Sequence, residues 1–287
     1  MTATTDLPVA GPSTPRERPV LTPPSLAVSA AVVVRRNLTH IKRMPEMLMD
    51  VTIQPVMFVL LFAFVFGGSI DVPGTPNGYD EWLLGGIMGQ TIAFASFIVA
   101  VGLTADIDKG IVDRMRSLPI NPAAVLVGRS LSSLLHSSIG IVVMSLTGLL
   151  IGWRIRNGVV DAALAYLLLL MWGFAMIWVG ILVGSAMRSV EAVNGLMFTT
   201  MFPITFLANT FAPTEGMTPV LRTIAEWNPI SSLVQAVREL WGNTGPAPDT
   251  AALPLQYPVE STIIWTIAIT AVVAPLALRA FRKRTGD

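Results

Sequence analysis

The sequence predicts an all-α membrane protein with six transmembrane helices, and three observations lead to that fold class. Charged residues make up 13% of the 287 residues, about half of the roughly 25% that soluble domains carry. The mean hydropathy is +0.65. Long uncharged apolar stretches recur along the chain, and six of them reach or approach the length that crosses a bilayer.

The expected spans follow from those stretches, because a bilayer crossing needs about 20 mostly apolar residues. The apolar runs show no strict alternation, and strands of membrane barrels are only about 9–11 residues long, so a β-barrel is disfavoured. The last stretch is short, but Arg279 and Arg282 can snorkel to the membrane surface at its end. The six spans are expected at about 51–70, 82–104, 126–153, 162–187, 192–214 and 259–281.

The distribution of Lys and Arg predicts the orientation of the chain. With six spans, 15 of the 19 basic residues fall on the side that holds both termini. Basic residues concentrate on the cytoplasmic side of membrane proteins. The chain is therefore expected to be a multi-pass protein of the plasma membrane with both termini in the cytoplasm. Residues 1–24 contain six prolines and little bulk, and they are expected to form a disordered cytoplasmic tail before a membrane domain at 25–284.

A charged segment at 106–118, between the second and third spans, is expected to form one short amphipathic helix. Ile107, Ile111, Met115 and Leu118 recur on a 3.6-residue period and give the helix one apolar stripe. Pro119 is expected to end it. From the residues alone, two interpretations remain open: a helix on the membrane surface, or a docking helix for a cytosolic partner.

Two further amphipathic regions flank the spans. Residues 25–44 predict a basic helix that lies in the membrane interface near anionic lipid, with Arg35, Arg36, Lys42 and Arg43 on its polar side. Residues 213–241 predict two short helices on the outer side, broken at Asn228-Pro229 after Trp227, with Ser232 and Gln235 as a capping box for the second. This outer hairpin could be a packing lid or a gate.

Polar and aromatic residues inside the expected spans are candidates for a substrate path. Polar residues within a membrane are functional candidates, although a lone His among serines more often bonds between helices, and aromatic residues more often pack or face lipid. The candidate residues are Gln90, Phe94, His136, Asn194, Phe198, Phe202 and Phe206.

Several kinds of chemistry have no support in the sequence. There is no G-x-x-x-x-G-K-[ST] phosphate loop, no metal-ligand cluster, no G-x-S-x-G motif and no cysteine. The net charge of +1 implies no affinity for nucleic acid. We therefore expect a chain that is not an enzyme, holds no cofactor or metal of its own and depends on a partner for energy.

Three stretches resemble the type-2 ABC exporter permeases, and within them the daunorubicin/doxorubicin-resistance subfamily. They are IKRMPEMLMDVTIQPVMFVLLFAFVFGG (41–68), DIDKGIVDRMRSLPINPAAVLVGR (106–129) and FPITFLANTFAPTEGMTPVLRTIAEWNPISSLVQAVREL (202–240). The resemblance covers roughly residues 35–284 in order.

The resemblance implies an architecture and partners. Residues 25–44 would be the interfacial helix, 106–118 the coupling helix and 213–241 the outer re-entrant helices. Two permeases, identical or siblings, would pair, and each would sit on a nucleotide-binding subunit that carries ATP and Mg²⁺. The coupling residues would be Asp106, Ile107, Lys109, Gly110, Ile111, Arg114, Met115, Leu118 and Pro119.

The expected function is therefore the permease subunit of an ATP-driven exporter that moves a hydrophobic or amphipathic drug or antibiotic out of the cell. Membrane lipid and the hydrophobic small molecule would be its further contacts. Alternatives are export of a cell-envelope lipid or glycolipid by the same machinery, a secondary transporter, and a membrane anchor that recruits a cytosolic enzyme without transport.

Overall fold

The computed structural model describes residues 49–66, 78–116 and 122–286, together with the single positions 28, 31, 32, 34, 35, 39, 72 and 75. All regular structure in these ranges is helical. The elements are α2 (Met49–Phe66), α3 (Tyr79–Asp108), α4 (Ile111–Arg116), α5 (Pro122–Ile151), α6 (Val159–Ala186), α7 (Val190–Phe206), η2 (Thr214–Gly216), α8 (Pro219–Glu226), α9 (Pro229–Trp241), α10 (Leu253–Gln256) and α11 (Pro258–Thr285).

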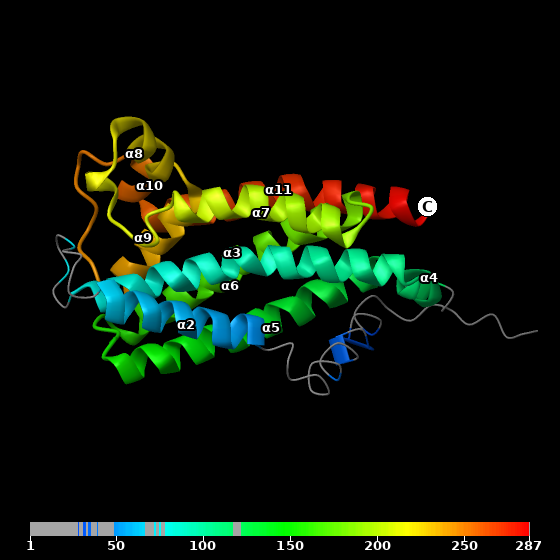
Figure 1. Ribbon diagram of the computed structural model, residues 1–287, viewed down its shortest axis with the longest axis horizontal. Coiled ribbons are helices and arrows are strands. Elements are labelled where there is room, and N and C mark those ends of the chain that lie inside the picture. Colours follow the sequence, from blue (N-terminus) through cyan, green and yellow to red (C-terminus); the bar gives the residue numbers. More distant parts are fainter. Residues whose placement is uncertain are drawn as a thin grey trace, which may run out of the picture.

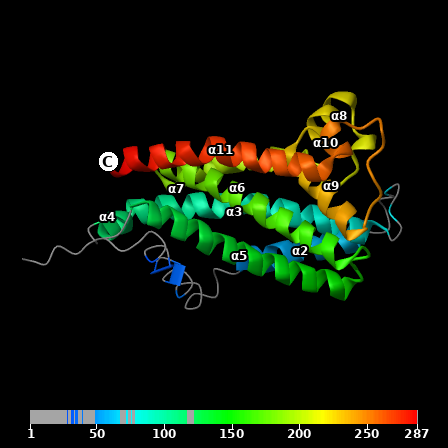
Figure 2. The ribbon, with the colours of Figure 1, turned by 180° about the vertical axis from the view of Figure 1, so that it is seen from behind.

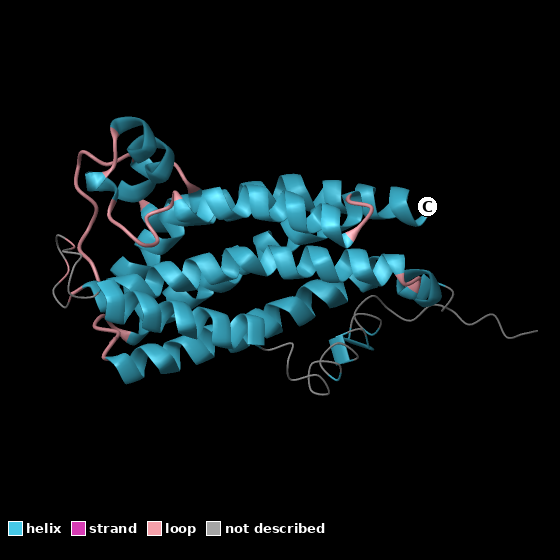
Figure 3. Ribbon diagram, in the orientation of Figure 1, coloured by secondary structure: helices cyan, strands magenta, loops and turns pink. Residues whose placement is uncertain are grey.

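The long helices form a bundle with two different ends (Figure 1, Figure 3). Helices α2, α3, α5, α6, α7 and α11 run along its long axis. Short helices α8, α9 and α10 gather at one end, here called the α9 end, while α4 and the C-terminus lie at the other, the α4 end. The view from behind shows the same division (Figure 2).

Four of these helices are long and apolar enough to cross a membrane. They are Tyr79–Asp108, Leu126–Ile151, Val159–Ala186 and Pro258–Arg284, with mean hydropathies of 1.8 to 2.3. Helices α2 and α7 are shorter, at 18 and 17 residues. Among the described residues the structure thus bears out an all-helical chain with four candidate spans, and the two other expected spans correspond to shorter helices.

Helix α7 ends earlier than the sequence predicted. The fifth span was expected to reach residue 214, but the helix stops at Phe206, three residues after an internal proline, Pro203. Beyond that point, the carbonyl oxygens of Asn209 and Thr210 accept hydrogen bonds from the Arg238 side chain. These backbone acceptors are therefore satisfied by a side chain that is distant in the sequence. The apolar stretch extends past Phe206, but the helix does not.

Helix α9 forms where its sequence signals predict, but a different residue caps it. The Oδ1 atom of Asn228 accepts from the backbone N–H of Ile230 at 2.9 Å, and Pro229 occupies the first turn, where a missing N–H costs nothing. The expected capping box of Ser232 and Gln235 is wrong, because both residues lie inside the helix. One face of α9 is buried, since its members are at most 2% exposed: Ile230, Leu233, Val234, Val237 and Trp241.

Close packing of α3 against α6 forms the centre of the bundle. A Cβ atom on Gly180 would lie 2.2 Å from the carbonyl oxygen of Ser96, and one on Gly184 would lie 2.6 Å from that of Ala100. Small residues let the backbones of two membrane helices approach in this way. The largest buried apolar cluster includes Leu83, Trp172 and Trp241, and so joins α3, α6 and α9.

The expected interfacial helix at 25–44 lies almost entirely outside the described residues. Its single described positions 28, 31, 32, 34, 35 and 39 are helical. Arg35 is one of them, whereas Arg36, Lys42 and Arg43 are outside the described ranges. The extent and placement of this helix therefore remain predictions.

Candidate functional site

The expected coupling helix at 106–118 is wrong as a single helix. Helix α3 continues to Asp108, and α4 begins at Ile111. Between them, Gly110 has φ +66°, in the left-handed region where only glycine is unstrained, and its N–H donates to the carbonyl oxygen of Ile107 at 2.9 Å. The glycine therefore ends α3 and turns the chain into α4.

This turn separates the residues of the expected apolar stripe. Ile107 belongs to α3 and Ile111 to α4, and both are half-buried. Val112, which sequence reasoning did not single out, is 1% exposed and lies in one buried cluster with Leu126 and Phe281. Lys109 and Arg114 are exposed. The side chain of Met115 and all of Leu118 and Pro119 lie outside what the structure describes.

Two arginines from other helices hold the end of α3. Arg129 of α5 places its Nη1 atom 2.5 Å from Oδ2 of Asp106. Arg284 of α11 places its Nη2 atom 2.9 Å from Oδ1 of Asp108. A carboxylate at the C-terminal end of a helix interacts unfavourably with the helix dipole. Both aspartates therefore need the positive charge of an arginine from another helix. Their partners lie 23 and 176 positions away in the chain, and pattern reasoning missed both pairs.

At the α9 end, the break at Asn228-Pro229 joins the hairpin to α7. The Nδ2 atom of Asn228 donates to the carbonyl oxygen of Ile204 at 2.6 Å, and Ser231 Oγ accepts from the N–H of Asn209 at 3.0 Å. Asn228 is 7% exposed, whereas Trp227 is 51% exposed. The predicted hairpin is therefore bonded to the end of α7.

A fully buried arginine completes the α9 end. Arg238 donates from Nε to the carbonyl oxygen of Trp82 at 2.7 Å, and from Nη1 and Nη2 to those of Asn209 and Thr210 at 3.0 Å each. Its guanidinium carbon lies 3.3 Å from the centroid of the Trp82 ring. Burial lowers the pKa of Arg238 well below its ordinary value, but an arginine keeps its proton in proteins, and the three carbonyl oxygens and the ring face stabilise that charge.

An ion pair on the same end ties the α5–α6 loop to α3. Glu81, 4% exposed, accepts from Nε and Nη2 of Arg156 at 3.0 and 2.6 Å. This hydrogen bonding raises the pKa of Arg156 above its ordinary value. Asn243 donates to Glu81 at 3.3 Å and accepts from the indole N–H of Trp153 at 2.7 Å. The outer loops are therefore fixed to the start of α3.

The structure gathers only part of the expected substrate path. Phe198, Phe202 and Phe206 stack along α7, with ring centroids 5.3 and 4.1 Å apart. The stack continues through Phe211 to Phe62 of α2, at 5.0 and 4.5 Å. The three rings on α7 are 37–60% exposed in the single chain, so the stack presents an open apolar surface.

Of the remaining path candidates, only Asn194 lies beside this stack, four residues before Phe198 on the same face of α7. Asn194 is exposed on α7, Phe94 is half-buried and Gln90 is 8% exposed, both on α3. His136 is half-buried on α5, which packs against α2, α3 and α6. The structure therefore places Asn194 beside the aromatic stack and leaves Gln90, Phe94 and His136 on other helices.

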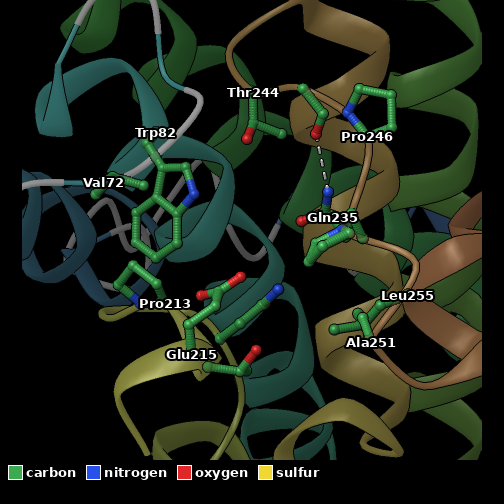
Figure 4. A pocket seen from close by; sticks show the side chains of 14 residues that line it. Val72, Trp82, Pro213, Glu215, Gln235, Thr244, Pro246, Ala251 and Leu255 are labelled. Carbon is green, nitrogen blue, oxygen red and sulfur yellow. Dashed lines mark hydrogen bonds between the residues drawn. The ribbon is translucent and has the colours of Figure 1, made fainter.

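A small pocket lies between η2, α9 and the loop that follows α9 (Figure 4). Trp82, Glu215 and Gln235 line it, and Gln235 donates across it to the carbonyl oxygen of Gly245 at 3.3 Å. Its volume of about 80 Å³ is below the roughly 300–1,000 Å³ of sites for drug-sized ligands. The pocket is therefore too small to be the path of such a compound.

The part of the chain that the structure describes holds no group of three or more His, Cys, Asp or Glu residues that could hold a metal ion. Its polar clusters consist of arginines paired with carboxylates and carbonyl oxygens. Such contacts position helices.

These features define a class, a multi-helix membrane protein with a short helix turned out at one end and, at the other, a hairpin whose second helix is buried. The chain belongs to the ABC-2 type transporter family, which matches residues 29–240.

Individual relatives agree with this family. The chain is 29% identical over 261 residues to a daunorubicin resistance ABC transporter permease protein of Streptomyces coeruleorubidus, covering 88% of both chains. It is 23% identical to a probable doxorubicin resistance ABC transporter permease protein of Mycobacterium tuberculosis, covering 80% of both. It is 25% identical to a putative transport permease of Porphyra purpurea, covering 74% of this chain and 73% of the relative.

Proposed function

We propose that this chain is the permease subunit of an ATP-driven exporter that moves a hydrophobic or amphipathic compound out of the cell. The observation that carries the proposal is the family match across residues 29–240, which includes α4 and the two arginine-held aspartates before it. A multi-pass position in the plasma membrane, with both termini in the cytoplasm, agrees with the bias of basic residues.

ATP and Mg²⁺ would be bound by a separate nucleotide-binding subunit, since the sequence has no phosphate loop. In this proposal the partner docks on the α3–α4 junction, where Lys109 and Arg114 are exposed and Ile111 is half-buried. Two permeases, identical or siblings, would pair above two such subunits. The expected interfacial helix at 25–44 and all six spans belong to the same proposal.

The cargo class rests on the aromatic stack of α7 and on the relatives. The exposed rings of Phe198, Phe202 and Phe206 form a surface on which a flat apolar compound could stack. Two relatives carry daunorubicin or doxorubicin resistance in their names. We therefore take daunorubicin as the probe, and a cell-envelope lipid or glycolipid as the alternative cargo.

Docking can be tested by cross-linking, because the chain contains no cysteine. A single cysteine at Ile111, in a chain co-expressed with the proposed nucleotide-binding subunit, is expected to cross-link to that subunit. A cysteine at Val160, 81% exposed at the α9 end, serves as the control and should not. An Ile111→Asp variant is expected to change the ATPase rate of the complex.

Failure of the Ile111 cysteine to cross-link in an active complex would contradict docking at α4. If no nucleotide-binding subunit co-purifies at all, the chain would instead be a membrane anchor or a secondary transporter. Export that persists after loss of the ATPase subunit would indicate a secondary transporter, because a membrane anchor would not export at all.

A further inference from the structure

Arg284 joins the ends of three helices at the α4 end. It lies in the last turn of α11, and its side chain is 17% exposed. Its Nη1 atom donates to the carbonyl oxygens of Gly184, at 2.8 Å, and of Met187, at the C-terminal end of α6. Its Nη2 atom donates to Asp108, the last residue of α3. One guanidinium thus links α3, α6 and α11.

The three contacts suit an arginine and no other side chain. The last carbonyl oxygens of a helix lack helical partners and carry partial negative charge, so they attract a cation with several donors. A planar guanidinium can donate to two carbonyls on one side and to a carboxylate on the other, whereas a lysine ammonium is a point charge on a flexible stem. The site is therefore built for Arg284.

Arg284 lies close to α4, the helix that a docked partner would move. Asp108 is followed by the Lys109-Gly110 turn and then by α4. Val112 of α4 is buried in one cluster with Ala277 and Phe281, from the same part of α11 as Arg284. The ion pair therefore joins the end of α11 to the end of α3, and the apolar cluster groups α4 with the same part of α11.

We infer that Arg284 is a positioning residue that makes the ends of α3, α6 and α11 move as one body with α4. Displacement of α4 by a partner then reaches three long helices at once. Without the guanidinium, the end of α11 could stay behind while α3 and α6, which pack backbone to backbone at Gly180 and Gly184, tilt together. This inference rests on the proposed function, because only a nucleotide-driven partner gives α4 a cyclic displacement to pass on.

The test uses spin labels in the cysteine-free chain. Labels on cysteines at Ala105, half-buried near the end of α3 and outside the proposed docking residues, and at the exposed Lys283 report the distance between the ends of α3 and α11 by double electron–electron resonance. The full chain is measured in lipid nanodiscs, alone and with the nucleotide-binding subunit, in ADP and in ATP with vanadate. We expect one narrow distance peak that stays unchanged between the nucleotide states.

The variant Arg284→Gln is expected to lose the single peak and to give distances that differ between the nucleotide states. Asp108→Asn removes the charge on α3 but leaves the carbonyl contacts to α6, so it should loosen the same distance if Arg284→Gln fails to fold. Arg284→Lys should restore part of the narrow peak. The control is Arg279→Gln, which removes an exposed charge one turn earlier in α11 and should behave as the parent chain does.

A single narrow peak in Arg284→Gln, or equal broadening in Arg279→Gln, would overturn the inference. A second readout is the amount of daunorubicin moved for each ATP hydrolysed. A merely structural role would lower both rates together, whereas a positioning role lowers transport while ATP hydrolysis continues. If no nucleotide-binding subunit binds the chain, the proposed function fails, yet the nanodisc measurement on the chain alone still reports whether Arg284 fixes the three helix ends.

Discussion

At the scale of single residues, Arg238 joins several segments at the α9 end. It is 0% exposed and donates to three backbone carbonyls on two different segments, the start of α3 and the turn after α7. Gly86 makes room for it, since a Cβ there would lie 2.7 Å from Nη2 of Arg238 and 2.2 Å from the Thr210 carbonyl oxygen. The buried position of Arg238 therefore requires a glycine at position 86.

We expect Arg238→Met to destabilise the protein strongly, because it removes the donors to the buried carbonyl oxygens of Asn209 and Thr210, which lie outside any helix, at about 1–3 kcal/mol each. Arg238→Lys should recover only part of the loss, since an ammonium cannot reach all three carbonyls and the ring. Thermal unfolding in detergent measures both. Arg188→Met, at an exposed position, is the matched control, and equal melting temperatures for the two methionine variants would contradict this role.

Phe202 is the central ring of the aromatic stack on α7. Phe202→Ala is expected to weaken daunorubicin-stimulated ATPase activity of the complex, because stacking of a flat compound needs the ring face. Phe64→Ala, which removes an 80% exposed ring of α2 that does not belong to the stack, should leave the stimulation intact. Similar behaviour of the two variants would place the cargo elsewhere.

At the scale of elements, the contact between α3 and α6 decides the shape of the bundle. Gly180→Ala would push a methyl group against the Ser96 carbonyl oxygen, where a Cβ has only 2.2 Å. We expect a loss of about 1–3 kcal/mol, as overpacking usually costs. Gly195→Ala on α7 has nothing within 4 Å and should be neutral or stabilising. Unfolding in detergent compares them, and a neutral Gly180→Ala would show that the two helices can separate at little cost.

Elements were predictable where one local signal decided them. The long apolar runs predicted α3, α5, α6 and α11, and Asn228-Pro229 predicted the start of α9. The break between α3 and α4 was missed because the apolar stripe keeps its helical period across Gly110, and periodicity does not register one residue with positive φ. Gly110 itself was the available signal, since glycine commonly follows the last residue of a helix.

The contacts that organise both ends of the bundle could not be predicted from sequence patterns. Arg129 and Arg284 were read only as part of a basic bias, and their aspartate partners lie on other helices. Arg238 lies between the expected fifth and sixth spans and was therefore assigned to the outer side of the membrane, but it is buried inside the protein. Local reasoning assigns a charge to a side of the membrane, but which helix it binds depends on the tertiary fold.

At the scale of the whole molecule, the two ends have different constructions. The α9 end is closed by a buried arginine, an ion pair and a hairpin that is bonded to α7. The α4 end consists of helix termini held together by two arginine–aspartate pairs around a short helix with exposed Lys109 and Arg114 nearby. This asymmetry suits a membrane domain that is moved from its α4 end.

The sides of the bundle also fit a membrane domain that pairs with a second subunit. In the apolar windows of α5 and α11, only 28% and 17% of residues are buried within the chain, against 72% in α3. Lipid or another chain must cover the remaining apolar surface, because water would not. Helices α3 and α6 are therefore the core of the bundle, and α2, α5, α7 and α11 are its outer surface.

The proposed function is export of a hydrophobic compound with ATP hydrolysed by a separate subunit. Its most direct test is uptake of daunorubicin into inside-out vesicles that contain the chain with its nucleotide-binding subunit. We predict accumulation that requires ATP, the subunit and the intact α3–α4 junction, and that is lost in Ile111→Asp. Accumulation that continues without the nucleotide-binding subunit, or that needs only an ion gradient, would contradict the account.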